Sequence, residues 1–337
     1  MICKRSFQTV LPAVYAVFIF TFCPILSAEN KKAPAPGDIP AYSPPQKGFF
    51  ENLVDLFIPH YEKRHVIYKK ESEYFLITVE DDESGRRHLV FNPNHGSQGI
   101  ILPSEPDKIV PNFLKYSFLA YSAGEKVPER VLFIGLGAGI MPRFIAGNFP
   151  GTNIDIVELD KAVPEIAEKY FGFKVGKNMH LIIEDGRYYV NRSGKKYDLI
   201  VIDAYNSKEI PFQFTTVEFF EKVKGMLSDG GLVVANIANF GRKNFISSEF
   251  ATVKSVFKNI GVVLCPYKTN YVLFASDKIT FDIEQWKKKS AAFDKRYKWD
   301  FSLLSFLDSA LPPGELKKMT EKAKILSDDY APVNDMD

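Results

Sequence analysis

The chain has 337 residues, of which 46% are hydrophobic and 25% are charged, values typical of a globular protein with a sizeable core. Its 43 Lys and Arg residues nearly balance 41 Asp and Glu residues, and a net charge of +2 argues against a broad nucleic-acid-binding surface. Two of the three cysteines, Cys3 and Cys23, lie in the N-terminal segment described next. A processed chain would keep only Cys265, and a single cysteine cannot form an internal disulfide. We expect Cys265 to be a small buried apolar residue and not a nucleophile.

Residues 1–28 have the pattern of an export signal. A basic pair, Lys4-Arg5, precedes an uncharged apolar stretch over residues 10–26, and Ser27-Ala28 supplies small residues at a loose cleavage site. We therefore expect an exported protein, periplasmic or secreted. The alternative is an uncleaved membrane anchor, because about 18 apolar residues can just span a bilayer. Only in that case would the membrane be a partner.

Three further regions flank a central α/β region. Residues 29–48 are rich in Pro and polar residues and predict a linker. Residues 49–122 predict a short helix over 49–58 and then a small β-domain that ends in a helix over 110–122. Strand-like runs of the β-domain cover residues 65–68, 74–79 and 88–91, with a hairpin loop over 81–85. Residues 281–337 predict a charged, helical C-terminal tail.

In residues 129–280, strand-like and helix-like segments alternate. Strands are predicted over residues 131–134, 153–158, 180–184, 198–203 and 232–237, and helices between them include 162–170 and 216–226. This alternation predicts a mostly parallel, doubly wound α/β sheet. The last two runs, 261–265 and 271–275, are separated by a short turn. Parallel strands need a longer connection, so this pair predicts an antiparallel hairpin at the sheet edge.

The first strand of the α/β region runs into three alternate glycines, Gly135, Gly137 and Gly139. Glycines at this place let the chain turn sharply and let a nucleotide-like group approach the backbone. A dinucleotide site requires G-x-G-x-x-G, and Ile140 occupies the place of the third glycine. The pattern therefore favours an adenosyl sulfonium nucleoside over a dinucleotide. A tight packing turn is the alternative.

Acidic residues end the next three strands or begin the turns after them. Glu158 can accept hydrogen bonds from ribose hydroxyls, and Asp185, followed by Gly186, can accept one from an adenine amine. Asp203 lies at the same crevice and could serve as base or orienter for an amine nucleophile, which must lose a proton before attack. The alternative for Glu158 is a surface or capping carboxylate, and that for Asp185 is an ordinary turn. The alternative for Asp203 is a structural or helix-capping Asp. Residues 204–212 predict a lid over the site.

No metal site is predicted. The five histidines are scattered, without an i, i+4 pair, and the sequence has no P-loop, G-x-S-x-G or C-x-x-C motif. On the β-domain, Gln98 is expected to face the crevice, whereas His95 is better interpreted as part of a loop. We expect no tightly bound cofactor and no nucleic-acid partner.

Together these features resemble the spermidine synthase (polyamine aminopropyltransferase) family over residues 68–276. The resemblance rests on an ordered set of motifs, each of them weak when taken alone. They are Glu71-Ser-Glu-Tyr74, the glycine turn with Pro142-Arg143, Val157-Glu-Leu-Asp160, Glu184-Asp-Gly-Arg187, Tyr197-Asp-Leu-Ile-Val-Ile-Asp203, Pro211, Phe214-Thr-Thr-Val-Glu-Phe-Phe220 and Leu227-Ser-Asp-Gly-Gly-Leu232. The tail Asp328-Asp-Tyr-Ala-Pro-Val333 is similar to that of spermidine synthase-like bacterial proteins.

The resemblance implies a class I methyltransferase-like (Rossmann-like) fold that binds decarboxylated S-adenosylmethionine as co-substrate at the glycine turn. Glu158 would hold the ribose and Asp185 the adenine. Asp203 would help to deprotonate an amine such as putrescine, which attacks the aminopropyl carbon and releases methylthioadenosine. The substrate-binding residues expected on this basis are Tyr74, Gln98, Tyr116 and Tyr205. Pairing of two copies through the β-domain is also implied.

Four positions depart from the family pattern. Ala138 stands where the family has an Asp that holds the aminopropyl ammonium, and Asn206 replaces a second Asp. Phe75 replaces a Gln, and Ser117 replaces a His or Gln. The adenosine half of the site is therefore better preserved than the polyamine half. Two alternatives stay open: an S-adenosylmethionine-dependent methyltransferase, and an exported non-catalytic protein that binds a nucleoside or a polyamine. Export favours the latter, since the decarboxylated donor is made in the cytoplasm.

Overall fold

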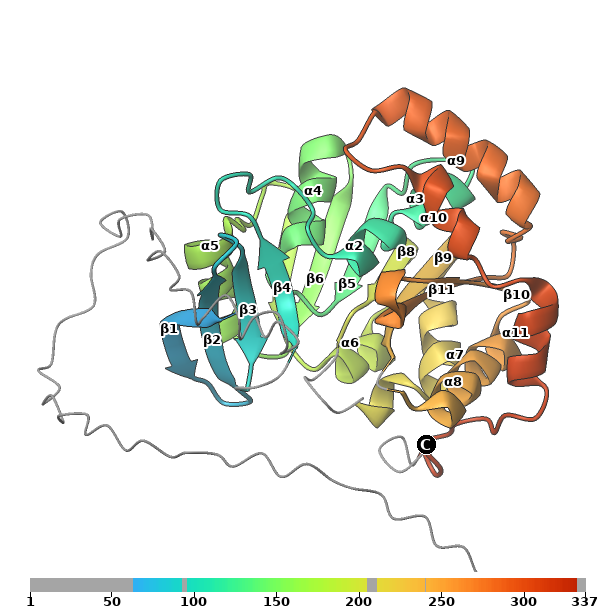
Figure 1. The fold of residues 1–337 in the computed structure, drawn as a ribbon. Coiled ribbons are helices and arrows are strands. Elements are labelled where there is room, and N and C mark those ends of the chain that lie inside the picture. The colour runs from blue at the N-terminus through green and yellow to red at the C-terminus, as the bar shows by residue number, and fades with distance from the viewer. Residues whose placement is uncertain (1–62, 93–95, 205–210, 240, 332–337) are drawn as a thin grey trace, which may run out of the picture. The chain divides into compact units, whose positions relative to one another are not determined.

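Two β-sheets form the framework of the protein in the computed structural model, which describes residues 63–92, 96–204, 211–239 and 241–331 (Figure 1). All of these residues fall in the second of two units of the chain, residues 55–337. The predicted signal segment, linker and first helix lie outside the described residues, as do His95, Tyr205, Asn206 and most of the predicted lid. Within the described part, no helix has both the length and the apolar character needed to cross a bilayer.

The smaller sheet is antiparallel, in the order β1-β2-β3-β4. Its strands are β1 (Arg64–Glu71), β2 (Leu76–Asp82), β3 (Arg87–Phe91) and β4 (Ser97–Ile101). The hairpin predicted over residues 81–85 is confirmed, because the Gly85 amide donates to the Asp82 carbonyl and Gly85 has φ 79°. Strand β2 begins later than predicted, since the Ser72 amide donates to the Phe75 carbonyl and closes a turn before it.

The larger sheet has seven strands in the order β10-β11-β9-β8-β5-β6-β7, and its parallel pairs and flanking helices confirm the predicted doubly wound α/β fold. Strand β11 is antiparallel to both β9 and β10, which confirms the predicted edge hairpin. The strands are β5 (Arg130–Ile134), β6 (Asn153–Glu158), β7 (Met179–Ile183), β8 (Tyr197–Ile202), β9 (Leu227–Ala238), β10 (Asn259–Leu264) and β11 (Asn270–Ser276).

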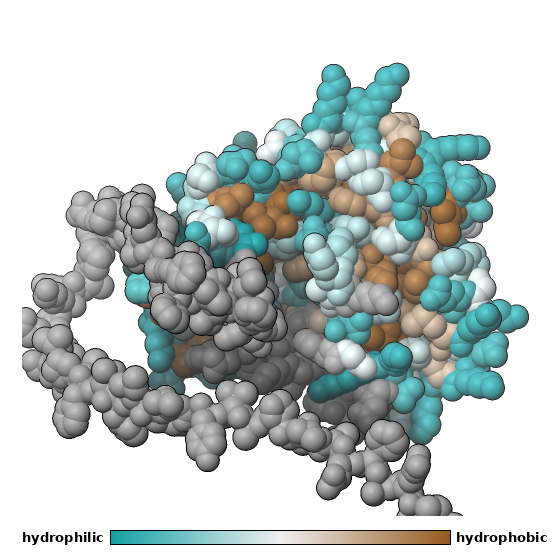
Figure 2. Space-filling model, in the orientation of Figure 1, coloured by the Kyte–Doolittle hydropathy of each residue, from teal (hydrophilic) through white to brown (hydrophobic). Residues whose placement is uncertain are grey.

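Alternate residues of the central strand β5 enter two different cores. Val131 and Phe133 pack with the helices on one face of the sheet, and Leu132 and Ile134 pack with those on the other. A strand covered on both faces is continuously apolar, as the sequence of β5 is. On the visible outer face, hydrophilic residues are interspersed with smaller groups of hydrophobic ones (Figure 2).

Helices cover both faces of the large sheet. Those whose side chains join the first core include α4 (Ile140–Asn148), α5 (Ala162–Phe171) and α9 (Ile283–Tyr297); the second core takes α6 (Gly186–Arg192), α7 (Val217–Gly225), α8 (Lys243–Val256) and α11 (Pro313–Thr320). Shorter elements are α2 (Asn112–Ser117), α3 (Leu119–Ala123), α10 (Leu303–Phe306) and the 3-10 turns Phe212–Phe214, Pro266–Lys268 and Leu307–Ser309. The helix predicted over 110–122 is thus two helices, which meet at the fully buried Phe118.

Candidate active site

A cavity of about 300 Å³ lies beyond the carboxyl ends of the parallel strands, where open α/β sheets bind their ligands. The strand ends supply one wall, and the small sheet with α2 supplies another. The lining residues are Phe75, Phe91, Gly96, Ser97, Gln98, Phe113, Ile134, Gly135, Leu136, Gly137, Val157, Glu158, Leu159, Asp185, Gly186, Asp203, Ala204, Pro211, Gln213, Phe214, Asn236, Ala238, Thr269 and Asn270.

The three glycines of the turn after β5 serve two purposes. All three have left-handed φ angles of 98°, 55° and 68° in chain order, a conformation that glycine adopts without strain. Gly135 and Gly137 line the cavity, and a Cβ at Gly135 would overlap the carbonyl oxygen of Asp203. A Cβ at Gly139 would lie only 2.5 Å from Cδ2 of Phe173, and Gly139 is not among the lining residues. Gly139 therefore allows close packing behind the turn, which the sequence did not separate from a ligand role.

Glu158 ends β6 with its carboxylate at the cavity. Its Oε2 accepts a hydrogen bond of 2.9 Å from the Leu136 amide, and its Oε1 accepts one of 3.0 Å from the Asp160 amide. Burial raises the pKa of Glu158, and these two hydrogen bonds act in the opposite direction. A carboxylate has about four acceptor sites, so both oxygens can still accept a hydrogen bond from neighbouring hydroxyls such as those of a ribose.

Asp185 and Gly186 line the cavity at the end of β7. Asp185 also caps helix α6, because its Oδ1 accepts a hydrogen bond of 2.8 Å from the Tyr188 amide. A Cβ at Gly186 would lie 2.6 Å from Cγ2 of Ile134, so only glycine lets α6 start this close to β5. The capping role and a ligand role are compatible, since the second carboxylate oxygen makes no hydrogen bond to the described residues.

Asp203 lies at the cavity after β8 and is bound by Asn236 of β9, which in turn is bound by Asn270 of β11. Nδ2 of Asn270 donates to Oδ1 of Asn236 over 2.8 Å, and Nδ2 of Asn236 donates to Oδ1 of Asp203 over 2.9 Å. Burial of its carboxyl group raises the pKa of Asp203, and the bond from Asn236 opposes this. Oδ2 of Asp203 makes no hydrogen bond to the described residues and is available to a ligand.

Sequence reasoning missed Asn236 and Asn270. A signal for Asn236 was present: it is a polar residue in the middle of a run of buried apolar residues in β9, and a buried amide needs a partner. The predicted strand over 232–237 was also too short. Strand β9 begins at Leu227, where it pairs with Tyr197 before an irregularity in register.

The electrostatic character of the cavity is anionic. Its described charged residues are Glu158, Asp185 and Asp203, and none of its described lining residues is a Lys, Arg or His. Aromatic rings complete the wall: Phe75 stacks on Phe91 with centroids 4.6 Å apart, and Phe113 and Phe214 also line the space. The arrangement favours a cationic ligand with an aromatic or apolar part, and disfavours a phosphate.

Three positions singled out in the sequence lie elsewhere. Tyr74 is 46% exposed and does not line the cavity. Tyr116 is buried and stacks on Phe306, with ring centroids 4.1 Å apart. Ala138 is buried under β4, where a Cβ at Gly99 would overlap its side chain. Of the predicted substrate-binding residues, Gln98 alone both falls within the described part of the chain and lines this space.

Residues 118–288 match the spermine/spermidine synthase domain family. The chain is 42% identical over 133 residues to a polyamine aminopropyltransferase of Vibrio vulnificus, a match that covers 39% of this chain and 44% of the relative. It is 31% identical over 164 residues to the human eEF1A lysine and N-terminal methyltransferase, covering 44% and 23%. Each match thus spans less than half of the relative's length.

Solved structures share the fold. A probable spermidine synthase from Corynebacterium glutamicum aligns with a TM-score of 0.63 at 22% identity, over 77% of this chain and 96% of that one. Human methyltransferase-like protein 13, crystallised with SAH, aligns with a TM-score of 0.51 at 24% identity, over 57% and 95%. The methyltransferase-like architecture predicted from the sequence is thereby confirmed.

Proposed function

The chain belongs to the spermine/spermidine synthase domain family, and from this premise we propose that it transfers an aminopropyl group from decarboxylated S-adenosylmethionine to a polyamine such as putrescine. One observation carries the proposal: the cavity presents three carboxylates and no described basic side chain. Both co-substrates are cations. Decarboxylated S-adenosylmethionine carries a sulfonium and an ammonium group, and putrescine carries two ammonium groups. An anionic cavity attracts such ligands.

The donor would bind at the strand ends. Gly135 and Gly137 leave room for the nucleoside against the backbone, Glu158 accepts from the ribose hydroxyls, and Asp185 accepts from the adenine amine. The rings that line the cavity, such as Phe214, supply apolar contact for the base. These roles are proposed because Glu158 and Asp185 line the cavity and keep unused acceptor capacity.

The transfer step needs a base. Oδ2 of Asp203 takes a proton from the acceptor ammonium, and the freed nitrogen attacks the aminopropyl carbon beside sulfur. The carbon–sulfur bond breaks, its electron pair stays on sulfur, and neutral methylthioadenosine leaves while the amine becomes a secondary ammonium. Burial raises the pKa of Asp203, which makes it a stronger base than a solvated carboxylate.

A second candidate, methyl transfer from S-adenosylmethionine, is favoured by Ala138. This buried side chain provides no carboxylate beside the glycine turn, so a donor that keeps its own carboxylate meets less repulsion there. The 31% identity to a protein methyltransferase is in keeping with this candidate. A protein that binds these ligands without turnover is the third candidate.

Calorimetry on the full chain separates the three. Methylthioadenosine, S-adenosylmethionine and the decarboxylated donor are titrated in turn, and mass spectrometry then follows products after putrescine is added. Methylthioadenosine release with spermidine formation supports aminopropyl transfer; S-adenosylhomocysteine points to methyl transfer. Absence of binding by all three nucleosides would exclude both enzymes.

We also propose that the protein acts outside the cytoplasm, on the basis of the apolar segment over residues 10–26 behind Lys4-Arg5. An N-terminal fusion of residues 1–48 to alkaline phosphatase, which is active only after export, tests this proposal. An inactive fusion that accumulates in the cytoplasm would contradict it. A substitution of the apolar segment by polar residues is the matched control.

A further inference from the structure

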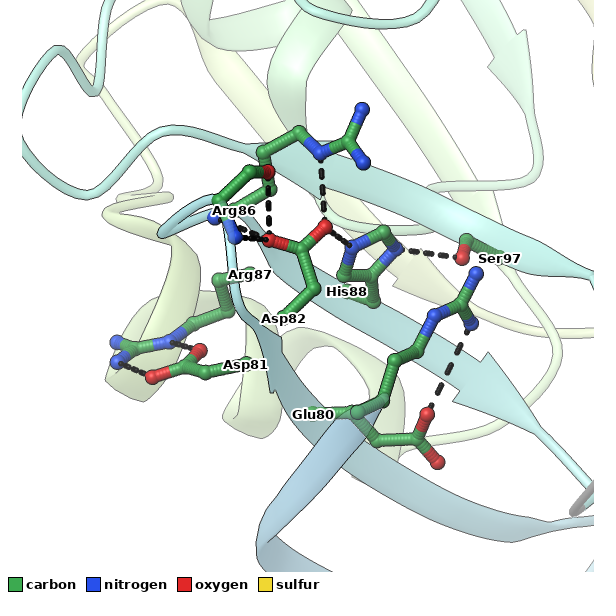
Figure 3. A network of polar contacts seen from close by, with 9 residues as sticks. Glu80, Asp81, Asp82, Arg86, Arg87, His88 and Ser97 are labelled. Carbon is green, nitrogen blue, oxygen red and sulfur yellow. Dashed lines mark hydrogen bonds and ion pairs between the residues drawn. The ribbon is translucent and has the colours of Figure 1, made fainter. Parts of the chain in front are cut away.

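Three side chains of the small sheet, Asp82, His88 and Ser97, are joined by hydrogen bonds (Figure 3). Nε2 of His88 lies 2.9 Å from Oδ2 of Asp82, and its Nδ1 lies 2.8 Å from Oγ of Ser97. The side chains of Asp82 and His88 are 0% and 2% exposed, whereas Ser97 is partly exposed and lines the cavity. None of the three residues was singled out by the sequence.

A β-bulge brings Ser97 to this chain. Strands β3 and β4 pair His88 with Ile100 and Leu89 with Gly99, but Val90 then faces Ser97, so Gln98 is the extra residue. Cross-strand partners share a face, and residues two apart in a strand do as well. Ser97 therefore lies on the face of Val90 and His88. Without the bulge it would pair with the next residue of β3 and point to the opposite face.

The carboxylate of Asp82 is held in its ionised form. Burial opposes ionisation, but hydrogen bonds from His88, Ser84 and Arg86 outweigh it and keep the pKa of Asp82 well below its usual range. Ser84 contributes its amide at 2.9 Å and its hydroxyl at 2.7 Å, both to Oδ1. Arg86 contributes its amide at 2.9 Å and its Nε at 2.8 Å.

His88 is held in its neutral form. Burial lowers its pKa, the hydrogen bond that it donates to Asp82 raises it, and the charges of Arg64 and Arg86 lower it further. Another charged group on this face, Glu80, pairs with Arg64 at 3.7 Å and directly opposes His88 across the strands.

The protonation states of Asp82 and His88 determine whether the Ser97 hydroxyl donates or accepts its hydrogen bond to His88. An ionised carboxylate can only accept, so neutral His88 carries its proton on Nε2 and donates it to Asp82. Nδ1 of His88 is then a bare acceptor, and the Ser97 hydroxyl must donate to it. Among the described residues Oγ of Ser97 has no other side-chain partner, so only its lone pairs remain for a ligand.

Strand β4 lies against the glycine turn. A Cβ at Gly137 would come within 3.0 Å of the Gln98 carbonyl oxygen, and Gly99 packs directly on Ala138. Gly99 pairs with Leu89 and Ser97 pairs with Val90, so the Ser97 side chain lies on the other face of β4 from Gly99 and lines the cavity beside the strand that packs on the turn.

We propose that Ser97, held by Asp82 through His88 as a hydrogen-bond acceptor, binds an ammonium group of the amine substrate. Asp82 and His88 are positioning residues in this arrangement, and Ser97 makes the contact. A ligand group that can only accept hydrogen bonds is disfavoured at the same place. This inference rests on the proposed function, because it assigns the amine to the described cavity.

The test is a titration of putrescine by calorimetry into the full chain saturated with methylthioadenosine. Ser97→Ala should weaken putrescine binding about 10-fold and leave methylthioadenosine affinity unchanged, whereas Ser97→Thr, which keeps the hydroxyl, should bind near the wild-type level. Ser305→Ala is the control, since it also removes a serine hydroxyl but does so at an exposed position that does not line the cavity. It should leave putrescine binding unchanged.

A double-mutant comparison separates positioning from structural support. In Asp82→Asn the amide can donate to His88 and move the imidazole proton to Nδ1, which turns the Ser97 hydroxyl toward the cavity as a donor. Asp82→Asn should therefore weaken putrescine binding in the wild-type background and have no further effect in Ser97→Ala. Equal losses in both backgrounds, or wild-type putrescine affinity in Ser97→Ala, would overturn the inference.

These binding measurements do not depend on turnover. A wild-type protein that binds putrescine without forming product defeats the proposed function, while the Ser97 variants still decide the inference. If the wild type forms product and Ser97→Ala binds putrescine as tightly as the wild type does, the inference is wrong and the proposed function stands. A protein that binds methylthioadenosine but not putrescine overturns the inference directly.

Discussion

Asn236 donates a hydrogen bond of 2.9 Å to Oδ1 of Asp203, from the strand next to the one that Asp203 follows. Asn270 fixes the orientation of the Asn236 amide by donating to its oxygen, so Nδ2 faces Asp203. One oxygen of the carboxylate is thereby occupied, and the other is left to a substrate. This relationship makes Asn236 a determinant of both the orientation and the basicity of Asp203.

Asn236→Ala should reduce kcat roughly 10- to 100-fold, within the range expected when a positioned base loses its support. The bond from Asn236 lowers the pKa of Asp203, so its loss raises that pKa. The ionised base then persists only at higher pH, and the acidic limb of the kcat/KM profile shifts to higher pH. Asn178→Ala is the control, because Asn178 bonds to a backbone carbonyl at an exposed position. An acidic limb that does not move in Asn236→Ala would contradict this role.

Gly135→Ala should abolish nucleoside binding and lower the free energy of unfolding by roughly 3 kcal/mol or more, since φ is 98° and the new methyl group overlaps the Asp203 carbonyl. Gly147→Ala provides the comparison. It lies in the last turn of α4, where a Cβ meets nothing within 4 Å. That substitution should stabilise the protein by up to about 1 kcal/mol. Chemical denaturation and calorimetry measure both effects, and normal methylthioadenosine binding by Gly135→Ala would disprove the close approach.

Glu249 makes stability depend on pH. It is buried in α8, its Oε2 has no hydrogen-bond partner, and burial raises its pKa from 4.5 to about 8. Between these values the unfolded chain ionises Glu249 and the folded protein keeps it neutral, so the stability that it contributes at low pH is lost as pH rises to 8. Glu249→Gln should therefore have a higher free energy of unfolding than the wild type, and this difference should be about 3 kcal/mol larger at pH 8 than at pH 5.

Urea denaturation at both pH values tests this prediction for Glu249. The control Glu221→Gln changes an exposed carboxylate on α7 and should leave the difference between the two pH values close to that of the wild type. An equal effect of Glu249→Gln at pH 5 and pH 8 would show that Glu249 is already ionised in the folded protein.

Much of the fold could be predicted because its signals are local. The apolar run of β5, the glycines after it and the short turn before β11 each reflect the conformation of a few neighbouring residues. The acidic residues at strand ends were predictable for a similar reason, since the carboxyl ends of parallel strands meet at one edge. Glu158, Asp185 and Asp203 accordingly lie around one cavity.

The remaining parts of the site depend on pairings that no local pattern reveals. Asn236 reaches Asp203, and Asn270 reaches Asn236, only because β9 lies between β8 and β11. The contact between Ser97 and His88 requires the bulge at Gln98, which shifts the register by one residue. Tyr116 was assigned to the substrate by resemblance, yet its ring packs on Phe306 from the C-terminal region.

The most direct measurement compares the wild type with Asp203→Asn for methylthioadenosine release from the decarboxylated donor in the presence of putrescine. The variant keeps the shape of the side chain and loses its basicity. We predict product from the wild type, a loss of turnover of at least about 100-fold in the variant, and methylthioadenosine binding within about two-fold of wild type. Equal product formation by the two proteins would remove Asp203 from the mechanism, and a wild type that binds the donor without releasing product with any diamine would contradict aminopropyl transfer.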